Sequence, residues 1–411
     1  MISTTLEQTI KEYVLEQSKG LVELIEAGSD DKWNGLINLG SELWLDTGDI
    51  DGASHIWIQQ FNGLTTNNTL LNKEIQKGIY DDLIPQANNI LSDLDEKERI
   101  IEIAFILNAL HGLKLVERFD RKVSVELHTD LAHNIEATIA YAQRYHDICP
   151  DKFIIKVPLT PSGLIATRQI VKKNIPVNFT IGFSARQNYI AAAFAHPAYV
   201  NVFLGRLNAY FADNGLSDGR YVGEKATCAS QRAVKQVSEE SGQVTRQIAA
   251  SMRNEQQIID LAGVDVYTIP VKVATAGFDI LTGNEERRIT ADYPVTPSPG
   301  IDETDIHMNL LWDVSQSVKD FVRVINEMEP GTGTELVACA YQNNLQDLFP
   351  QLSADETQTI KTDGKIPIHS KWQTRIKNET LAIDSLINLA ALASFETDQA
   401  ALDERVKRLI R

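Results

Sequence analysis

The sequence predicts an α/β protein whose core is a closed barrel of parallel strands, each followed by a helix. Three observations predict it. Short apolar runs alternate with longer stretches of helical periodicity over residues 42–270. Eight such runs occur, which is the number that closes a (β/α)8 barrel. Polar residues on neighbouring runs also share one parity, as expected of strands with a common interior.

The eight runs predicted as strands are 42–47, 63–67, 123–127, 153–158, 177–183, 199–204, 245–251 and 264–269. Helical periodicity precedes them over 3–27 and is clearest between them over 71–92, 96–117, 130–147, 161–173 and 184–194. The gap between the second and third strands is long enough for two or three helices. This order is that of a TIM barrel, although a doubly wound open sheet shows the same alternation and stays open as an alternative.

The parity of the strand residues predicts where a site lies. In four neighbouring strands the residues of one parity are apolar, and the other parity includes Glu126, Lys156, Asn178, Thr180 and Asn201. Because a layer of helices would cover the apolar set, we expect the polar set to face the barrel interior together. One polar residue on a strand is unremarkable, but a shared polar interior indicates a site.

After residue 270 the pattern changes. A Pro-rich polar connection over 286–302 leads to helical stretches over 305–328, 335–347, 373–393 and 396–410. The glycines of 329–334 are expected to form a loop, and no GK[ST] follows them as a P-loop would require. We therefore predict an N-terminal helical segment over 1–40, a catalytic barrel over 41–275 and a mostly helical extension over 276–411 that packs on the barrel.

Composition narrows the function classes. The 411 residues carry a formal charge of −17, which argues against a nucleic-acid partner, so any phosphate must be bound by a few local cations. The three cysteines have no metal-like spacing, and His128, Asp130 and His133 lack a common ligand geometry, so no metal site is predicted. With no signal-like start and no long apolar run, no membrane partner is expected and the cytoplasm is the expected location.

Lys156 is the first candidate for chemistry, because it lies in the apolar run FIIKVP. Burial would favour the neutral amine that attacks a carbonyl. A lysine near a strand end can also extend its amine to solvent, and local sequence alone leaves both readings open. Local sequence also leaves two interpretations of Asp46 open, because it could be only the N-cap of a strand-to-helix turn. Any single arginine could likewise form only a surface ion pair.

An ordered set of stretches resembles one known family. The run IIKVPLTPSGLIATRQIVKKNIPVNFTIGFSARQ (154–187) is similar to the lysine-bearing segment of the transaldolases. Matching stretches follow the family order: LWLDTGDI (43–50), GLTTNN (63–68), VSVEL (123–127), VNVFLGRL (200–207), AASMRNEQQIIDLAGVDVYTI (249–269) and the tail FETDQAALDERVKRLI (395–410). The chain therefore resembles Schiff-base enzymes that act on sugar phosphates in the pentose phosphate pathway.

The resemblance implies that a dihydroxyacetone unit is transferred from a ketose phosphate (sedoheptulose 7-phosphate or fructose 6-phosphate) to an aldose phosphate. Lys156 would form the Schiff base with the keto carbon, and Asp46 would take the proton of the C4 hydroxyl as the C3–C4 bond breaks. Glu126 and Thr180 would hold the water that shuttles protons. The protonated imine draws off the electrons of the carbanion, so neither a metal nor an organic cofactor is implied.

The resemblance also assigns the substrate contacts, which are Asn67, Asn178, Asn201, Phe203, Arg206, Ser251 and Arg253. Arg206, Ser251 and Arg253 would bind the phosphate at the open ends of the sixth and seventh strands. Asn67 and Asn178 would hydrogen-bond the hydroxyls and the dihydroxyacetone fragment.

Three departures from the family pattern affect these expectations. Asn68 stands where the family usually has proline, so we expect a less rigid turn after the second strand. Asn201-Val202 replaces the usual Ser-Pro, which puts the substrate preference in doubt. The segment over about 275–375 has no counterpart in shorter members and is expected either to cap the site or to form a contact between copies of the chain.

Two other functions remain alternatives. One is a fructose-6-phosphate-type aldolase that releases the three-carbon unit; that branch tends to have glutamine at Glu126 and tyrosine near Phe203, so both residues favour the transferase. The other is a barrel that binds sugar phosphates without turnover. The set Asp46, Glu126, Lys156 and Thr180 counts against it, and the changes at Asn68 and Asn201 leave it open.

Overall fold

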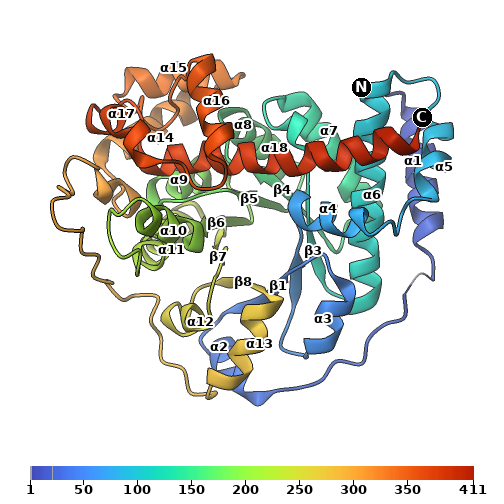
Figure 1. Ribbon diagram of the computed structural model, residues 1–411, viewed down its shortest axis with the longest axis horizontal. Helices are drawn as coiled ribbons and strands as arrows, with labels where there is room; N and C mark the ends of the chain where they lie inside the picture. The colour runs from blue at the N-terminus through green and yellow to red at the C-terminus, as the bar shows by residue number, and fades with distance from the viewer. Residues whose placement is uncertain (1, 21) are drawn as a thin grey trace.

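A closed barrel of eight parallel strands in sequence order forms the centre of the computed structural model, which describes residues 2–20 and 22–411 (Figure 1). The strands are β1 (Glu42–Asp46), β2 (Gly63–Thr65), β3 (Lys122–Glu126), β4 (Phe153–Pro158), β5 (Val177–Thr180), β6 (Tyr199–Phe203), β7 (Arg246–Ala250) and β8 (Val266–Pro270). The predicted (β/α)8 barrel is confirmed, and closure excludes the open sheet. β5 ends before the predicted residue 183, because Ile181 has a φ of 58° and leaves the extended conformation.

The helices before and around the barrel are α1 (Thr4–Ser18), α2 (Asn34–Asn38), α3 (Ile50–Ile56), α4 (Asn68–Gln76), α5 (Leu83–Ile90), α6 (Glu96–Phe119), α7 (Ile135–Ile148), α8 (Pro161–Val171), α9 (Ala185–Ile190), α10 (Leu204–Asp213), α11 (Val222–Ser241), α12 (Gln256–Asp260) and α13 (Val271–Ile280). The gap between β2 and β3 holds three helices, as predicted. The stretch 71–92 is two helices rather than one, because Gly78 (φ 83°) ends the first. The first helix ends at Ser18, not at residue 27.

Hydrogen-bonding side chains start the helices that follow the strands of the site. Asn67 accepts from the Leu70 amide at 2.9 Å, directly after β2. Thr160, after β4, accepts from the Gly163 amide at 2.8 Å, and Pro161 occupies the first helical position, where its fixed φ suits a helix start. These caps fix where each strand ends and therefore where its last inward side chain lies.

The predicted parity holds in the barrel. The apolar set, which includes Val125, Ile155 and Val177, is fully buried. Glu126, Lys156 and Asn178 occupy one row of the sheet, because Glu126 pairs in register with Lys156 and Lys156 pairs with Asn178. Side chains of one row and one parity point to the same side of the sheet, so three polar groups meet in the interior.

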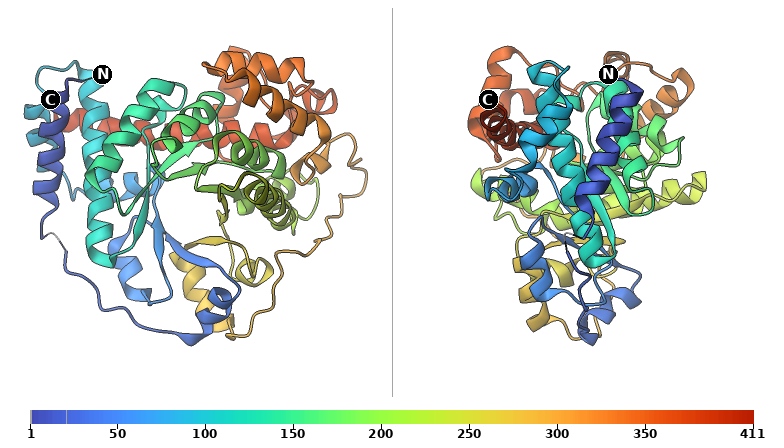
Figure 2. Two further views of the ribbon diagram at one scale, coloured as in Figure 1. Left: turned by 180° about the vertical axis from the view of Figure 1, so that it is seen from behind. Right: turned by 90° about the vertical axis from the view of Figure 1, so that its right-hand side faces the viewer.

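The C-terminal part contains α14 (Gln316–Met328), α15 (Gly333–Gln342), α16 (Ala354–Asp363), α17 (Gln373–Lys377) and α18 (Ile383–Leu409). An irregular segment leads to them along the outside of the barrel, and α14 to α17 gather beside α9 and α10 (Figures 1 and 2). The prediction of two separate helices over 373–393 and 396–410 was wrong, because this region contains the short α17 and one continuous helix of 27 residues, α18. Helix α16 was missed by the prediction.

Helix α18 crosses the strand ends of the barrel (Figure 1) and is tied to them by buried polar groups. Asn388 donates hydrogen bonds to the carbonyls of Leu159 and Ile181, just beyond β4 and β5, at 3.2 and 2.8 Å. Arg186 of α9, which is 1% exposed, donates two hydrogen bonds to the fully buried Asp384, each of 2.8 Å. These bonds fix the C-terminal helix over the carboxyl ends of the barrel strands.

No helix in the part of the chain that the structure describes is long and apolar enough to cross a membrane.

Candidate active site

A cavity of about 220 Å³ opens at the carboxyl ends of the strands, where TIM barrels carry their active sites. The predicted site residues that line it are Asp46, Asn67, Lys156, Asn178, Asn201, Phe203, Arg206, Ser251 and Arg253. Glu126 and Thr180 do not line it and lie fully enclosed, with 3% and 0% of their surface exposed. The structure thus brings together residues that are spread over more than 200 positions of the chain.

Lys156 does not extend to solvent. Its side chain is 5% exposed, and its Nζ donates a hydrogen bond to the Thr66 carbonyl at 3.1 Å. The amine borders the cavity, where it acts electrostatically on both Asp46 and Glu126. A primary amine in this position can reach the carbonyl carbon of a ligand in the cavity.

Asp46 does not cap a helix; Asp49 does, through a hydrogen bond from the Gly52 amide. Instead, the Asp46 carboxylate accepts a 3.0 Å hydrogen bond from the Thr65 hydroxyl, which also bonds the hydroxyl of Thr268. Burial raises the pKa of Asp46, and the nearby charge of Lys156 and the Thr65 hydrogen bond oppose the rise. A carboxyl of this kind is a stronger proton acceptor than an exposed one.

Glu126 is held by the turn that follows β2. The backbone N–H of Asn68 donates to a Glu126 carboxylate oxygen at 3.0 Å, and the Asn68 side chain donates to the Leu127 carbonyl at 3.3 Å. Burial raises the pKa of Glu126, while the charge of Lys156 and the Asn68 N–H lower it. A proline has no N–H, so the departure at Asn68 adds a hydrogen bond between the start of α4 and β3. These two bonds indicate a more rigid turn than we expected.

The amides of β5 and β6 form a chain across the barrel. The Asn201 side-chain amide donates to the Asn178 side-chain oxygen Oδ1 at 2.6 Å, and the Asn178 side-chain amide donates to the Ser124 hydroxyl at 3.0 Å. Among the described residues, the Thr180 hydroxyl and the Asn201 side-chain oxygen Oδ1 are buried without a hydrogen-bond partner. Buried polar groups are normally paired, so these two atoms mark places where a polar ligand would be bound favourably.

A cationic group lies at the ends of β6 and β7. Arg206 is 6% exposed, and among the described residues its Nη1 is buried without a partner. Burial, followed by repulsion from Arg253, lowers the pKa of Arg206 to about 10, so it stays charged at neutral pH. Ser251 adopts a φ of 65°, which is costly for a residue other than glycine. The close approach needs Gly205, because a Cβ there would lie 2.1 Å from the Ser251 carbonyl oxygen.

Ten residues that line the cavity were not predicted as site residues from the sequence, and three of them are charged or aromatic. Lys73 of α4 and Lys365, after α16, add two cations to its rim, and Phe395 of α18 adds an aromatic wall. The Phe395 ring centre is 6.5 Å from that of Phe203 and 5.9 Å from the Arg206 guanidinium carbon. The tail around Phe395 was already matched to the family's last helix, and this was the available signal. Lys365 had no such signal.

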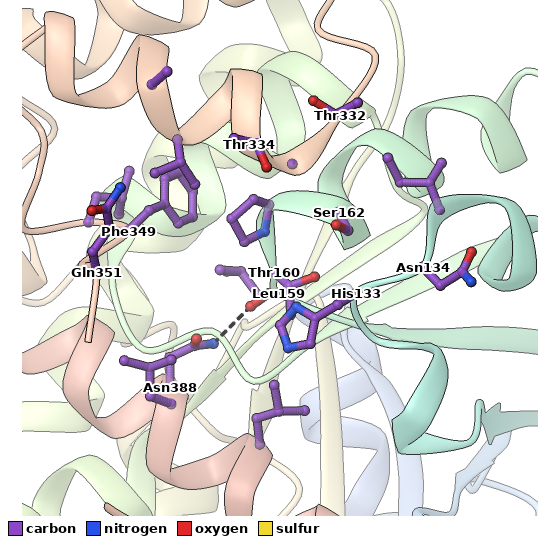
Figure 3. Close-up of a pocket in the computed structure, with 18 of the residues that line it drawn as sticks. His133, Asn134, Leu159, Thr160, Ser162, Thr332, Thr334, Phe349, Gln351 and Asn388 are labelled. Carbon is purple, nitrogen blue, oxygen red and sulfur yellow. Dashed lines mark hydrogen bonds between the residues drawn. The ribbon is translucent and has the colours of Figure 1, made fainter. Parts of the chain in front are cut away.

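A larger cavity of about 960 Å³ lies elsewhere, between the N-terminal ends of α7, α8 and α15 and the first half of α18 (Figure 3). It contains none of the predicted site residues, but His133, Asn134 and Thr332 line it. His128 points away from it, since its Nε2 is 3.2 Å from an Asp403 oxygen. The size of this cavity does not make it the site, because its lining lacks a lysine or arginine for an anion.

Comparison with known proteins agrees with the geometry. Residues 43–321 match the family described as Transaldolase/Fructose-6-phosphate aldolase. The transaldolase of Xanthomonas euvesicatoria pv. vesicatoria is 32% identical over 233 residues, which are 54% of this chain and 71% of that protein. A transaldolase of Xanthomonas oryzae pv. oryzae is 31% identical with the same coverage, and that of Nostoc punctiforme is 29% identical over 235 residues, 54% of this chain and 69% of its own.

The matched region runs from β1 into α14 and therefore contains the whole barrel apart from its first strand residue. It includes every residue that was expected to contact the substrate. By this match the chain belongs to the transaldolase/fructose-6-phosphate aldolase family and is an enzyme of the aldolase/transaldolase type.

Proposed function

We propose that the protein is a transaldolase in which Lys156 carries a dihydroxyacetone unit from a ketose phosphate to an aldose phosphate, the reaction of the pentose phosphate pathway. One observation supports this above others: a buried lysine amine shares a cavity with a carboxylate on β1 and with two arginines beyond β6 and β7. An amine, a base and an anion site are the three elements that a Schiff-base reaction on a sugar phosphate needs.

The covalent step begins when Lys156 Nζ attacks the C2 carbonyl of the donor. The carbinolamine loses water and becomes a protonated imine, and Glu126 with Thr180 is positioned to hold the water that moves these protons. Glu126 pairs in register with Lys156, and Thr180 pairs with Pro158, two residues further along β4. The Thr180 hydroxyl has no partner among the described residues. The amine thus gains a carbon–nitrogen bond while the carbonyl oxygen leaves as water.

Cleavage then requires a base. Asp46 takes the proton of the C4 hydroxyl, the C3–C4 bond breaks, and its electron pair moves through C3 into the imine to give an enamine. The aldehyde product departs. When an acceptor aldehyde binds, the enamine carbon attacks it and Asp46 returns the proton to the new hydroxyl. Water finally hydrolyses the imine and restores the free amine of Lys156.

The choice between transfer and simple aldol cleavage rests on what happens to the enamine. Glu126 and Phe203 are the residue types of the transferase branch, and Phe203 packs against Phe395 over the cavity. Aromatic cover keeps bulk water from the enamine, so the intermediate survives until an acceptor aldehyde arrives. This supports transfer over release of dihydroxyacetone.

The test combines an assay of the sugar products with borohydride trapping of the imine on Lys156. With fructose 6-phosphate and erythrose 4-phosphate we expect sedoheptulose 7-phosphate, and with fructose 6-phosphate alone little dihydroxyacetone. Borohydride reduction followed by peptide mass mapping should place a three-carbon adduct on Lys156. Lys156→Met should lose both signals, whereas Lys152→Met should keep them, because Lys152 is a partly exposed lysine that precedes β4 and pairs with Asp120. Transfer that survives in Lys156→Met would refute the proposal.

A further inference from the structure

We propose that Lys365, which the C-terminal segment contributes, is a third cation of the phosphate site and determines the preference for phosphorylated over unphosphorylated sugars. The inference rests on the proposed function and deepens it. Lys365 lies about 160 residues after Arg206 in sequence, yet it lines the same cavity as Arg206 and Arg253. It lies beyond residue 321, where the match to the family ends, and no family position was carried over to it.

The backbone before Lys365 is held against α18. Helix α16 ends at Asp363, and Gly364 then takes a φ of 77° with a ψ of −142°, a combination open essentially to glycine alone. One turn earlier, Lys361 Nζ lies 3.4 Å from a Glu396 carboxylate oxygen, next to Phe395. The sharp turn at Gly364 therefore directs Lys365 into the cavity instead of continuing the helix past it.

The backbone after Lys365 is held against α10, the helix that carries Arg206. Asn214, at the end of α10, donates to the Pro367 carbonyl at 3.0 Å and accepts from the His369 amide at 2.8 Å. The Tyr210 hydroxyl of α10 and a ring nitrogen of His369 are 2.8 Å apart. Lys365 thus lies between two anchored stretches, one held by α18, which carries Phe395, and one held by α10, which carries Arg206.

The amine of Lys365 is exposed and, within residues 2–20 and 22–411, forms no ion pair with a carboxylate. A phosphate monoester carries a charge of about −1.5 to −2 at pH 7. Burial is the main cause of the lowered pKa of Arg206, and repulsion between Arg206 and Arg253 lowers that pKa further. A dianion bound between them would relieve that repulsion, and a third cation at the rim, on the long flexible side chain of a lysine, would add to the attraction. Lysine suits this task, because it binds phosphate as a point charge without a fixed geometry.

The experiment compares Lys365→Met with Lys365→Arg and with Lys319→Met, a variant of α14 that makes the same charge change away from the cavity. For Lys365→Met we expect KM for fructose 6-phosphate to rise about five- to tenfold, the usual size for a lost charge-assisted contact, with kcat within about twofold. The kinetic constants for unphosphorylated fructose should not change. The dissociation constant of inorganic phosphate, measured by calorimetry without turnover, should rise in parallel.

Lys365→Arg should restore most of the phosphate affinity, because it keeps the charge, and Lys319→Met should match the wild type. The inference is overturned if Lys365→Met binds inorganic phosphate and fructose 6-phosphate like Lys319→Met, or if fructose kinetics change equally. Failure of the proposed function looks different: the wild type itself would then show no borohydride-trapped adduct on Lys156. A purely structural defect would lower the thermal midpoint of Lys365→Met and would not be rescued by arginine.

Discussion

The two ends of the cavity that contains Lys156 are built differently. At the β1–β5 end, hydrogen bonds of 3.0 Å hold Asp46, Glu126 and Asn178. The Thr65 hydroxyl donates to Asp46, the N–H of Asn68 donates to Glu126, and the Asn178 amide donates to the Ser124 hydroxyl. At the β6–β7 end, Arg206 is buried with an unpartnered nitrogen among the described residues, and Arg253 is exposed. The side chains of the β1–β5 end already have hydrogen-bond partners within the protein, whereas the Arg206 nitrogen at the β6–β7 end has none among the described residues.

This difference predicts that the two ends contribute to different steps, one to the chemical step and the other to substrate binding. A reaction centre gains from groups that are oriented before the substrate arrives, because orientation then costs nothing at the transition state. An anion site gains from donors that the anion itself completes. We therefore expect changes at the first end to lower kcat and changes at the second to raise KM for phosphorylated sugars.

The largest effect should come from Asp46→Asn at the preorganised end. The amide keeps the volume of the side chain but cannot accept the C4 proton, so kcat should fall on the order of 10²- to 10⁴-fold, as is typical when a general base is lost. Steady-state transfer kinetics measure this. KM for the donor should change little. A large rise in KM with kcat preserved would assign Asp46 to substrate binding and would contradict the proposed difference between the two ends.

A smaller effect is expected from Arg206→Met at the cationic end. Methionine fills the buried space but removes the charge-assisted contacts, so KM for fructose 6-phosphate should rise roughly 10- to 100-fold. Kinetics with fructose should stay near the wild type. Arg323→Met on α14, an arginine of the surface, serves as the matched control. Equal losses with fructose and its phosphate would show that Arg206 supports the fold instead.

The smallest effect concerns pH. The Thr65 hydroxyl stabilises the ionised form of Asp46 and thus lowers its pKa against the rise caused by burial. Thr65→Val keeps the shape and removes that bond, so the pKa of Asp46 should rise further. Since the ionised form is the base, kcat/KM should be lost at higher pH in this variant as the solution is acidified. An acid limb that does not move, or that moves to lower pH, would contradict the role of Asp46.

The β1–β5 end could be predicted largely from sequence, because strand parity is local and placed Lys156, Glu126 and Asn178 in one interior. The bond between Thr65 and Asp46 could not, since it depends on the register of β1 with β2. Lys365 depends on how a distant segment packs, which no local pattern encodes. The predicted division of the chain at residues 40 and 275 stays a prediction.

Missed elements in the C-terminal segment have physical reasons. The predicted helical stretches left a gap at residues 394–395, yet α18 continues through it. The helix packs on the barrel end and also on α4 and α6, so its residues contact protein on several sides. Helix α16 is mostly polar and shows little amphipathic pattern. Its capping box, in which Ser353 and Glu356 each accept from the other's amide, was the signal that the sequence did contain.

The most direct test of the central claim traps the intermediate in the Asp46→Asn variant. Its Lys156 should still form the imine with fructose 6-phosphate, but the C3–C4 bond should not break. After borohydride reduction, peptide mass mapping is predicted to find an intact six-carbon sugar phosphate on Lys156 in the variant and a three-carbon unit in the wild type. A three-carbon adduct in both proteins, or an adduct on another lysine, would contradict the account.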